Sequence, residues 1–343
     1  MLIQLPQISP RSILYGRLIG LGVLIALCAL TLVGSLMIGA RDITASQLWE
    51  FLLDPDPEDP LSQVVWQSRV PRTVLIAVAG AAFGAAGALI QAVTRNPLTD
   101  PGILGVNAGA ALAVVVALAF FNVSTMTSYM WWALAGAVIS SITVFIVGNT
   151  SAVRGKPVTL TLVGVAFAAV LGGFTSATLL TDSELLQRMR GWSAGTTASQ
   201  SLENTLAVVP LILVGLCLAF LLYRSLDVLA LGDASAIAMG ARPGRIRLVA
   251  LIAIALLAGA ATAAMGPVGF IGLVAPHVCK LLVGPHQGWI VAYCVFVAPI
   301  ILGCADVLGR VMTQGEIPVG VVTPFIGGPV LIYLVHRLRV TAP

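Results

Sequence analysis

Long hydrophobic stretches follow one another along most of the chain, and short polar or Gly/Pro-rich connectors separate them. A mostly apolar stretch of about 20 residues is long enough to cross a bilayer as an α-helix. The pattern predicts an all-α polytopic membrane protein, with residues 1–343 forming a single transmembrane domain. It contains ten expected spans, at 18–39, 73–93, 103–121, 130–149, 158–180, 205–223, 246–264, 268–283, 289–307 and 319–336.

Composition agrees with this fold class. Hydrophobic residues make up 58% of the chain and charged residues only 9%, whereas about 25% of a soluble domain is charged. The first apolar stretch, 18–40, is too long for the apolar region of a signal peptide and lies between Arg17 and Arg41. We therefore interpret it as a retained first span.

The distribution of basic residues predicts an orientation. An even number of spans places both termini on the same side of the membrane. If that side is the cytoplasm, twelve of the 18 Lys and Arg residues fall in inner segments and six in outer segments. Because inner loops carry the excess of basic residues, both termini are expected to be cytoplasmic.

The sequence offers little to support an enzyme. Gly155-Lys156 is followed by Pro157, where a phosphate-binding loop needs Ser or Thr. The three histidines and five cysteines show no metal-ligand spacing. We expect no catalytic residue, no metal and no cofactor in this chain. The spans also lack the rows of acids that proton-coupled carriers use, so the energy comes from another subunit or the protein is a passive channel.

Two Gly/Pro-rich segments, 95–110 and 266–277, interrupt the hydrophobic pattern. Irregular backbone within a membrane is tolerated only where protein or a water-filled cavity surrounds it. Each segment is therefore either a structural turn or part of a gate along a transport pathway. Each follows a helix rich in small residues, and two such units of opposite direction would be inverted repeats. The pathway candidates are Gln91, Asn96, Pro97, Pro101, Gly105, Asn107, Gly266 and Pro267.

The inner segment at about 224–247 is longer than a connection between two spans requires. It interleaves apolar and acidic residues, which predicts one or two short helices that dock on a partner. An amphipathic segment on the inner leaflet is disfavoured, because 227–241 contains no Lys or Arg. The candidate contact residues are Asp227, Leu229, Leu231, Gly232, Asp233, Ile237, Met239 and Gly240.

Motifs spread over nearly the whole chain resemble one known family. They include R-V-P-R at 69–72, the segment 95–110, G-V-A at 164–166, W-S-A-G at 192–195, L-G-D at 231–233, the segment 266–277, E-I-P-V-G-V-V-T at 316–323 and G-G-P at 327–329. With these motifs the chain resembles the iron-siderophore, haem and cobalamin permeases of the type II ABC importers. Within that family, 94–110 and 160–166 look closest to the ferric enterobactin permease subunits.

The resemblance implies a ten-helix subunit in a bacterial cytoplasmic membrane, importing a ferric siderophore, with haem or cobalamin as alternative cargo. It implies a second permease subunit, identical or different, two cytoplasmic ATPase subunits that bind ATP, and a periplasmic or lipid-anchored substrate-binding protein. Arg69, Arg72 and Arg310 match the residues that dock the binding protein in relatives. Alternatively, Arg310 pairs with Asp306 and the other two arginines anchor a span. An ion-coupled secondary transporter is the alternative from another class.

Overall fold

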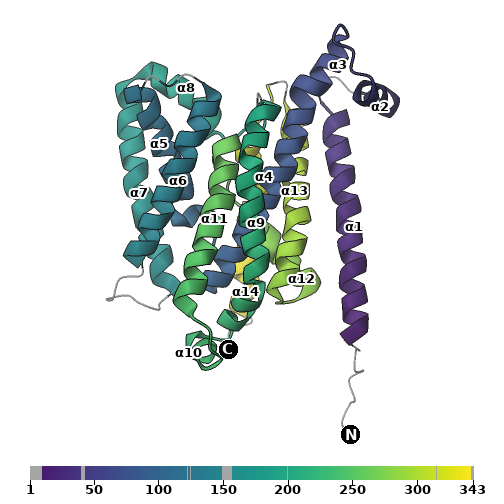
Figure 1. Ribbon diagram of the computed structural model, residues 1–343. Coiled ribbons are helices and arrows are strands. Elements are labelled where there is room, and N and C mark those ends of the chain that lie inside the picture. Colours follow the sequence, from purple (N-terminus) through teal and green to yellow (C-terminus); the bar gives the residue numbers. More distant parts are fainter. Residues whose placement is uncertain are drawn as a thin grey trace.

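The computed structural model describes residues 10–39, 43–121, 123, 125–148, 157–198, 200–313 and 315–340. Within these ranges the chain is a bundle of helices without strands (Figure 1). Seven helical stretches in the described part are long and apolar enough to cross a membrane, and three apolar helices are shorter. The predicted fold class is confirmed. The bundle consists of α1 (Pro10–Met37), α4 (Val70–Thr94), α5 (Val106–Phe121), α6 (Met126–Gly148), α7 (Pro157–Thr181), α9 (Leu202–Ala230), α11 (Pro243–Met265), α12 (Ile271–Val283), α13 (Gln287–Met312) and α14 (Val319–Val340).

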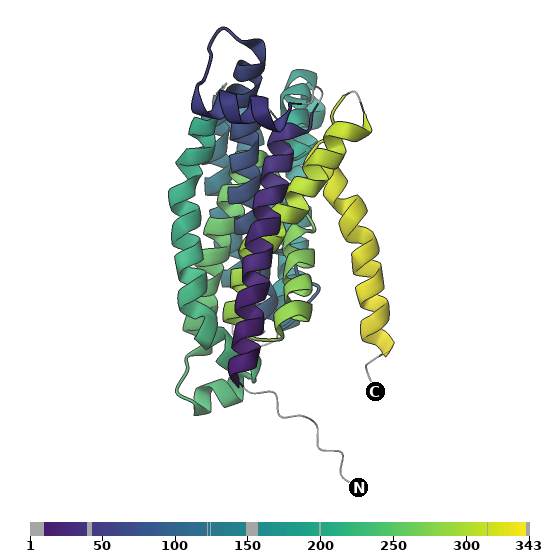
Figure 2. The ribbon, with the colours of Figure 1, turned by 90° about the vertical axis from the view of Figure 1, so that its right-hand side faces the viewer.

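Short helices mark the two ends of the bundle (Figure 1). We call the end that carries α2 (Ala45–Leu53), α3 (Pro60–Val64) and α8 (Ser183–Ser193) the upper end, and the end that carries α10 (Asp233–Ala238) the lower end. The three upper helices start at side-chain caps from Thr44, Asp59 and Asp182. α1 begins and α14 ends at the lower end (Figure 2), as an even number of spans requires.

α4 lies at the centre of the bundle. Pro60–Thr94 is the helical stretch that contains α4. Of its most apolar 18 consecutive residues, 83% are buried, whereas the corresponding share is 11% for α1 and 6% for α7. Glycines on α4 make this burial possible, because their neighbours approach the backbone closely. A Cβ atom on Gly80 would lie 2.7 Å from the Cα of Pro299, and one on Gly84 would lie 2.6 Å from the carbonyl oxygen of Cys294. α13 therefore packs directly on the α4 backbone.

We expect Gly87→Ala to destabilise the chain by about 1–3 kcal/mol, because the added methyl group would collide with the backbone of Gly272. The nearest atoms belong to a backbone, which cannot rotate away as a side chain can. Thermal unfolding in detergent measures the effect. Gly22→Ala on α1 is the control, since its Cβ atom would meet nothing within 4 Å. Equal unfolding temperatures for the two variants would contradict this account of the packing.

The inner segment differs from its prediction. α9 continues to Ala230, so residues 224–230 extend a spanning helix instead of forming a helix of their own. Leu226 and Leu229 are fully buried, and their three-residue spacing keeps both on the inward face of α9. The exposed connection is therefore limited to 231–242, and it contains one short helix, α10.

The two predicted breaks follow α4 and α11, and they approach each other, since a Cβ atom on Gly272 would lie 2.5 Å from Cδ of Pro101. Arg95, the residue after α4, lies in the left-handed region, with φ 49°, and a 3-10 turn (Pro101–Leu104) precedes α5. α11 ends at Gly266, with φ 83°, and the next helix begins only at Ile271. The eighth span is therefore shorter than predicted. Residues 266–270 are not helical, and Pro267 has no N–H for a helical hydrogen bond.

Candidate functional site

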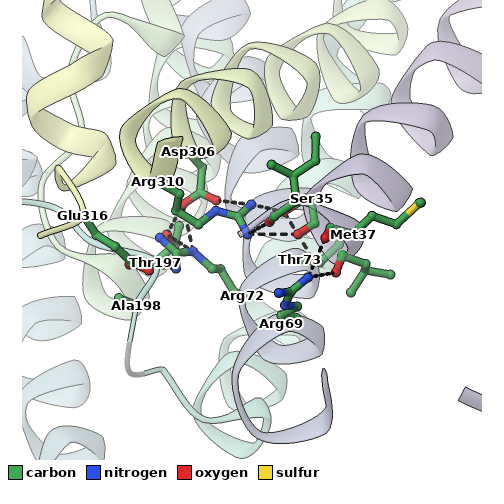
Figure 3. Close-up of polar contacts among 12 residues, drawn as sticks. Ser35, Met37, Arg69, Arg72, Thr73, Thr197, Ala198, Asp306, Arg310 and Glu316 are labelled. Atoms are coloured by element: carbon green, nitrogen blue, oxygen red, sulfur yellow. Dashed lines mark hydrogen bonds and ion pairs between the residues drawn. The ribbon is translucent and has the colours of Figure 1, made fainter. Parts of the chain in front are cut away.

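The three arginines predicted to dock a binding protein come together at the upper end (Figure 3). Arg69 ends a π-helical turn (Val65–Arg69), Arg72 lies in the first turn of α4, and Arg310 lies in the last turn of α13. They are 5%, 7% and 7% exposed. Since a buried charge is costly without partners, the surrounding acceptors decide what these residues can do.

Asp306 is the main acid of this cluster and is only 1% exposed. Its Oδ1 lies 3.0 Å from Nε of Arg72, and its Oδ2 lies 2.9 Å from Nη2 of Arg310. The Thr197 hydroxyl also donates to Asp306. Glu316 accepts a second bond from Arg72, with Oε2 at 3.0 Å from Nη1. The pairing of Arg310 with Asp306, which the sequence left as an alternative, is therefore present.

The upper end of α1 supplies further acceptors. Arg69 Nη1 donates to the carbonyl oxygens of Leu36, at 2.6 Å, and Met37, at 2.7 Å. Arg310 Nη1 donates to the carbonyl oxygen of Ile38, also at 2.7 Å. Carbonyl groups in the last turn of a helix have no partner within the helix, so the arginines satisfy them. The cluster ties α1, α4 and α13 together.

A cavity of about 250 Å³ opens beside this cluster, lined by the three arginines, Glu316, Gly39, Leu61, Val64 and Ser68. Arg72 and Arg310 pair with the carboxylates of Asp306 and Glu316, and the three guanidinium groups line the cavity beside a single carboxylate, that of Glu316. The cavity is therefore suited to an incoming carboxylate. The docking role stays a prediction, and the structure adds that the arginines also hold the fold.

Sequence reasoning did not include Asp306 and Glu316 among the site residues. The signal for Asp306 was an acid inside a predicted span, four residues before Arg310 and therefore on the same helix face. Glu316 carried no such signal, because its contact with Arg72 depends on how the chain turns between α13 and α14. At Glu316 that turn adopts a left-handed conformation, with φ 46°.

At the lower end, α10 and its flanking residues form an exposed apolar surface. Leu231, Ile237 and Met239 are 64%, 62% and 62% exposed. Gly232 and Gly240 turn the chain on either side of α10, with φ 106° and 80°, a region that residues with a Cβ atom rarely adopt. The three apolar side chains are exposed, as their predicted contact with a partner requires.

Two other residues predicted for that contact face the chain itself. Leu229 is fully buried in the core, so it cannot enter a groove on a partner. Asp227 Oδ1 accepts a hydrogen bond from the Gln287 N–H at 2.9 Å, and its Oδ2 lies 3.7 Å from Nδ1 of His286. Asp227 therefore fixes the start of α13 against α9.

Asp233, the first residue of α10, is held by two arginines. Arg247 on α11 donates to both carboxylate oxygens at 2.9 Å. Arg95 also pairs with Asp233, and its Nε donates to the Leu229 carbonyl oxygen at 3.0 Å. Because Arg95 directly follows α4 and begins the first broken segment, these contacts join α10 directly to that segment.

The predicted pathway residues divide between a cavity and the turns of the broken segments. A cavity of about 450 Å³ at the lower end is lined by Gln91, Arg95, Pro97, Lys280 and Gln287, among others. Gln91 is 2% exposed; its Oε1 accepts from Lys280 Nζ at 2.9 Å and its Nε2 donates to the Leu273 carbonyl oxygen at 3.2 Å. Gln91 thereby joins α4 to α12.

Outside the cavity, Asn96 Oδ1 accepts from the Leu98 N–H at 3.0 Å and shapes the first turn. Asn107 Oδ1 accepts from the Thr262 hydroxyl at 3.1 Å, which joins α5 to α11. The transport role of the candidates stays a prediction. The remaining ones are turn residues: Pro101, Gly105, Gly266 and Pro267.

Asp100 connects the two broken segments and was missed by sequence reasoning. Its Oδ1 accepts from the Gly102 N–H at 2.8 Å, and the Phe270 N–H lies close enough to the carboxylate to lower its pKa. Phe270 has a left-handed φ of 69° just before α12. Burial raises the pKa of Asp100 from 3.8 to about 6, although the two N–H groups act in the opposite direction.

We expect the folded chain to lose stability as the pH rises from about 4 through about 6, because the raised pKa means that the folded state binds the Asp100 proton more tightly than the unfolded state. Asp100→Asn removes this titration while keeping an acceptor for Gly102. Unfolding temperatures of both proteins across this pH range isolate the Asp100 contribution as their difference. A difference that does not change with pH would contradict the assignment.

One serine has the spacing of a hydrolase nucleophile, G-x-S-x-G, at 191–195. A nucleophile elbow lies between a strand and a helix, whereas Ser193 is the last residue of α8. Its hydroxyl donates to the Met189 carbonyl oxygen at 2.7 Å. This geometry does not support hydrolase chemistry.

Comparison with known proteins gives consistent matches over nearly the full length. A family model described as the FecCD transport family matches residues 26–337. The ferric enterobactin transport system permease protein of Escherichia coli is 41% identical, and the match covers 95% of this chain and 97% of that protein. The iron(3+)-hydroxamate import system permease protein of Bacillus subtilis is 34% identical, over 97% of this chain and 87% of that protein.

A solved structure supports the same arrangement of helices. It is a metal-chelate type ABC transporter in an inward-facing conformation, 25% identical in sequence, with a TM-score of 0.81. The match covers 92% of this chain and 98% of that one.

Proposed function

Because the chain belongs to the FecCD transport family, we propose that it is the membrane-spanning permease subunit of an ATP-driven importer that carries a ferric siderophore into the cytoplasm. The observation that carries the cargo assignment is the likeness, over almost the whole chain, to a ferric enterobactin permease. The helical bundle and the absence of a phosphate-binding loop from the sequence support a transport subunit that does not itself hydrolyse ATP.

The lower end contacts the ATPase. The exposed apolar side chains of Leu231, Ile237 and Met239 bury in a groove of that subunit, and one ATPase lies below each permease. This places the lower end, and therefore both termini, in the cytoplasm of a bacterial cell. The basic residues support the orientation, because Arg17, Arg95 and Arg224 belong to the lower end and inner segments carry the excess of Lys and Arg.

A second permease subunit, identical or different, packs against α7. An exposed face of this helix carries small residues, Ala166, Ala169, Gly173 and Ala177, at spacings that place them on one side. Small residues allow two membrane helices to approach closely. The low burial of α7 within this chain, 6%, leaves that face open for the second subunit.

A periplasmic or lipid-anchored binding protein delivers the cargo to the upper end. The cationic cavity receives an acidic side chain of that protein, which orients it. Because the three arginines also stabilise the fold, substituting them would confuse docking with folding. The cavity mouth provides a cleaner test, since Ser68 is exposed and lines the cavity.

We expect Ser68→Asp to weaken binding-protein affinity about tenfold, because a like charge then meets the incoming acid. Gln67→Asp is the matched control, since Gln67 is exposed on the adjacent position but does not line the cavity. Affinity is measured on the permease in bilayer discs. Equal affinities for the two variants would exclude docking through this cavity.

The proposed function is tested by ATP hydrolysis. The purified chain alone should hydrolyse no ATP, whereas the complex with its ATPase should hydrolyse ATP faster when the binding protein and a ferric siderophore are added. Hydrolysis by the isolated chain would contradict the proposal. Siderophore uptake by cells that lack the ATPase would instead indicate an ion-coupled secondary transporter.

A further inference from the structure

An open groove of about 650 Å³ runs between α1 and the pair α12–α13. α1 lies at the side of the bundle (Figure 1). Only 11% of its most apolar 18 consecutive residues are buried. A Cβ atom on Gly16 would meet nothing within 4 Å, so the groove is open at that position. Most of its lining is apolar, and includes Ile13, Gly16, Gly20, Val23, Leu27 and Leu282.

A cation lies at the lower end of this groove. Arg17 lines the groove, and its guanidinium group lies 5.8 Å from the ring centre of Trp289. Its Nη2 donates to the Val283 carbonyl oxygen at 2.8 Å, which holds the side chain in place. Among the described residues, no carboxylate lies within ion-pair distance, 4.0 Å, of Arg17. The charge of Arg17 is therefore open to an anion from outside the chain.

The dimensions of the groove fit one membrane leaflet. From Arg17 to Leu27, α1 rises about 15 Å. Half of the hydrocarbon core of a bilayer is about 15 Å thick, so an acyl chain can lie along the groove with its headgroup near Arg17. Trp289 and Tyr293 accompany Arg17 at this level, and such aromatic residues are enriched where a membrane meets water.

We propose that this groove binds an anionic phospholipid, with its phosphate at Arg17 and an acyl chain between α1 and α12. A water-soluble anion would gain nothing from the apolar walls, and a zwitterionic lipid such as phosphatidylcholine would bring a second cation close to Arg17 together with its phosphate. The assignment to the cytoplasmic leaflet rests on the proposed orientation of the importer. Lipid binding itself does not, because it can be measured on the purified chain without transport.

Native mass spectrometry of the purified chain tests the proposal, with phosphatidylglycerol and phosphatidylcholine of identical acyl chains added in equal amounts. The wild-type chain should retain phosphatidylglycerol in preference to phosphatidylcholine. Arg17→Gln should lower phosphatidylglycerol binding about fivefold, which corresponds to about 1 kcal/mol for one basic residue at a membrane surface. Arg17→Lys should keep most of the preference. Gly16→Leu should lower the binding of both lipids, because leucine fills the groove.

Arg224→Gln is the matched control, since Arg224 is an exposed cation on α9 that does not line the groove. It should leave binding unchanged. Equal phosphatidylglycerol binding by the wild-type, Arg17→Gln and Gly16→Leu chains would overturn the proposal. Loss of a protein dimer in Gly16→Leu would also overturn it, because a second copy would then occupy the groove. Neither result would affect the ATPase test of the importer.

Discussion

Replacing Asp306 by asparagine is expected to destabilise the folded chain by about 3–5 kcal/mol, because it removes the charge between two buried cations. The side chains of Arg72 and Arg310 are only 9% and 3% exposed, so water cannot compensate for the lost carboxylate. Asparagine keeps the size of the side chain and leaves no cavity. Thermal unfolding in detergent, together with the yield of folded protein after extraction, measures the effect.

Glu184→Gln is the control for this prediction. It breaks the pair between Glu184 and Arg188 at the same end of the molecule, but these side chains are 71% and 47% exposed. An exposed pair on one helix contributes only about 0.3–0.5 kcal/mol. If Asp306→Asn and Glu184→Gln lowered the unfolding temperature equally, the buried cluster would not stabilise the upper end as described.

Asp233→Asn is expected to reduce siderophore uptake about tenfold while the ATPase still co-purifies, since coupling between two sites is typically 1–3 kcal/mol. The side chains of Asp233, Arg95 and Arg247 are 31%, 29% and 19% exposed, so losing these pairs costs little stability. It does break the contact between α10 and the segment that follows α4. Uptake and ATPase co-purification are measured in the same membranes.

Ile237→Asp is the complementary variant, because it places a charge on the exposed apolar surface of α10 without touching Asp233. It should abolish ATPase co-purification as well as uptake. Wild-type uptake by Asp233→Asn would show that transport does not depend on the ion pairs of Asp233 with Arg95 and Arg247. Normal co-purification of Ile237→Asp would remove α10 from the ATPase contact.

Hydrophobic length predicted the spans well, because each spanning helix must satisfy its backbone hydrogen bonds within a mostly apolar stretch. The break at Gly266-Pro267 could also be predicted from the sequence, since Pro267 cannot donate a backbone hydrogen bond. The start of the inner segment could not be predicted from the sequence. Residues 224–230 have mixed polarity, yet the spacing of the buried Leu226 and Leu229 fits continuation of α9.

The partners of the arginines at the candidate site could not be predicted from hydrophobic patterning. Arg72 finds its partners at Thr197, Asp306 and Glu316, which are 125, 234 and 244 residues away in the sequence. Hydrophobic patterning reports on local structure and not on which helices become neighbours. The arginines were therefore recognisable as unusual, but their burial depended on tertiary packing.

The long-range contact of Asp100 could not be predicted from the sequence either. Its sequence context, between Thr99 and Pro101, predicts a turn, and the hydrogen bond to Gly102 agrees with that. Its contact with the Phe270 N–H joins segments that lie 170 residues apart in the printed sequence. Only the packing of the second break against the first reveals that this carboxylate connects them.

The central claim is that this chain transports a ferric siderophore using ATP hydrolysed by a partner. The most direct measurement is uptake of iron-labelled siderophore into vesicles that contain the complete permease, ATPase and binding protein. We predict accumulation of a ferric siderophore that requires hydrolysable ATP and is insensitive to a protonophore, with little uptake of haem or cobalamin. Accumulation that is driven by a proton gradient without ATP, or uptake of haem or cobalamin in place of the siderophore, would contradict it.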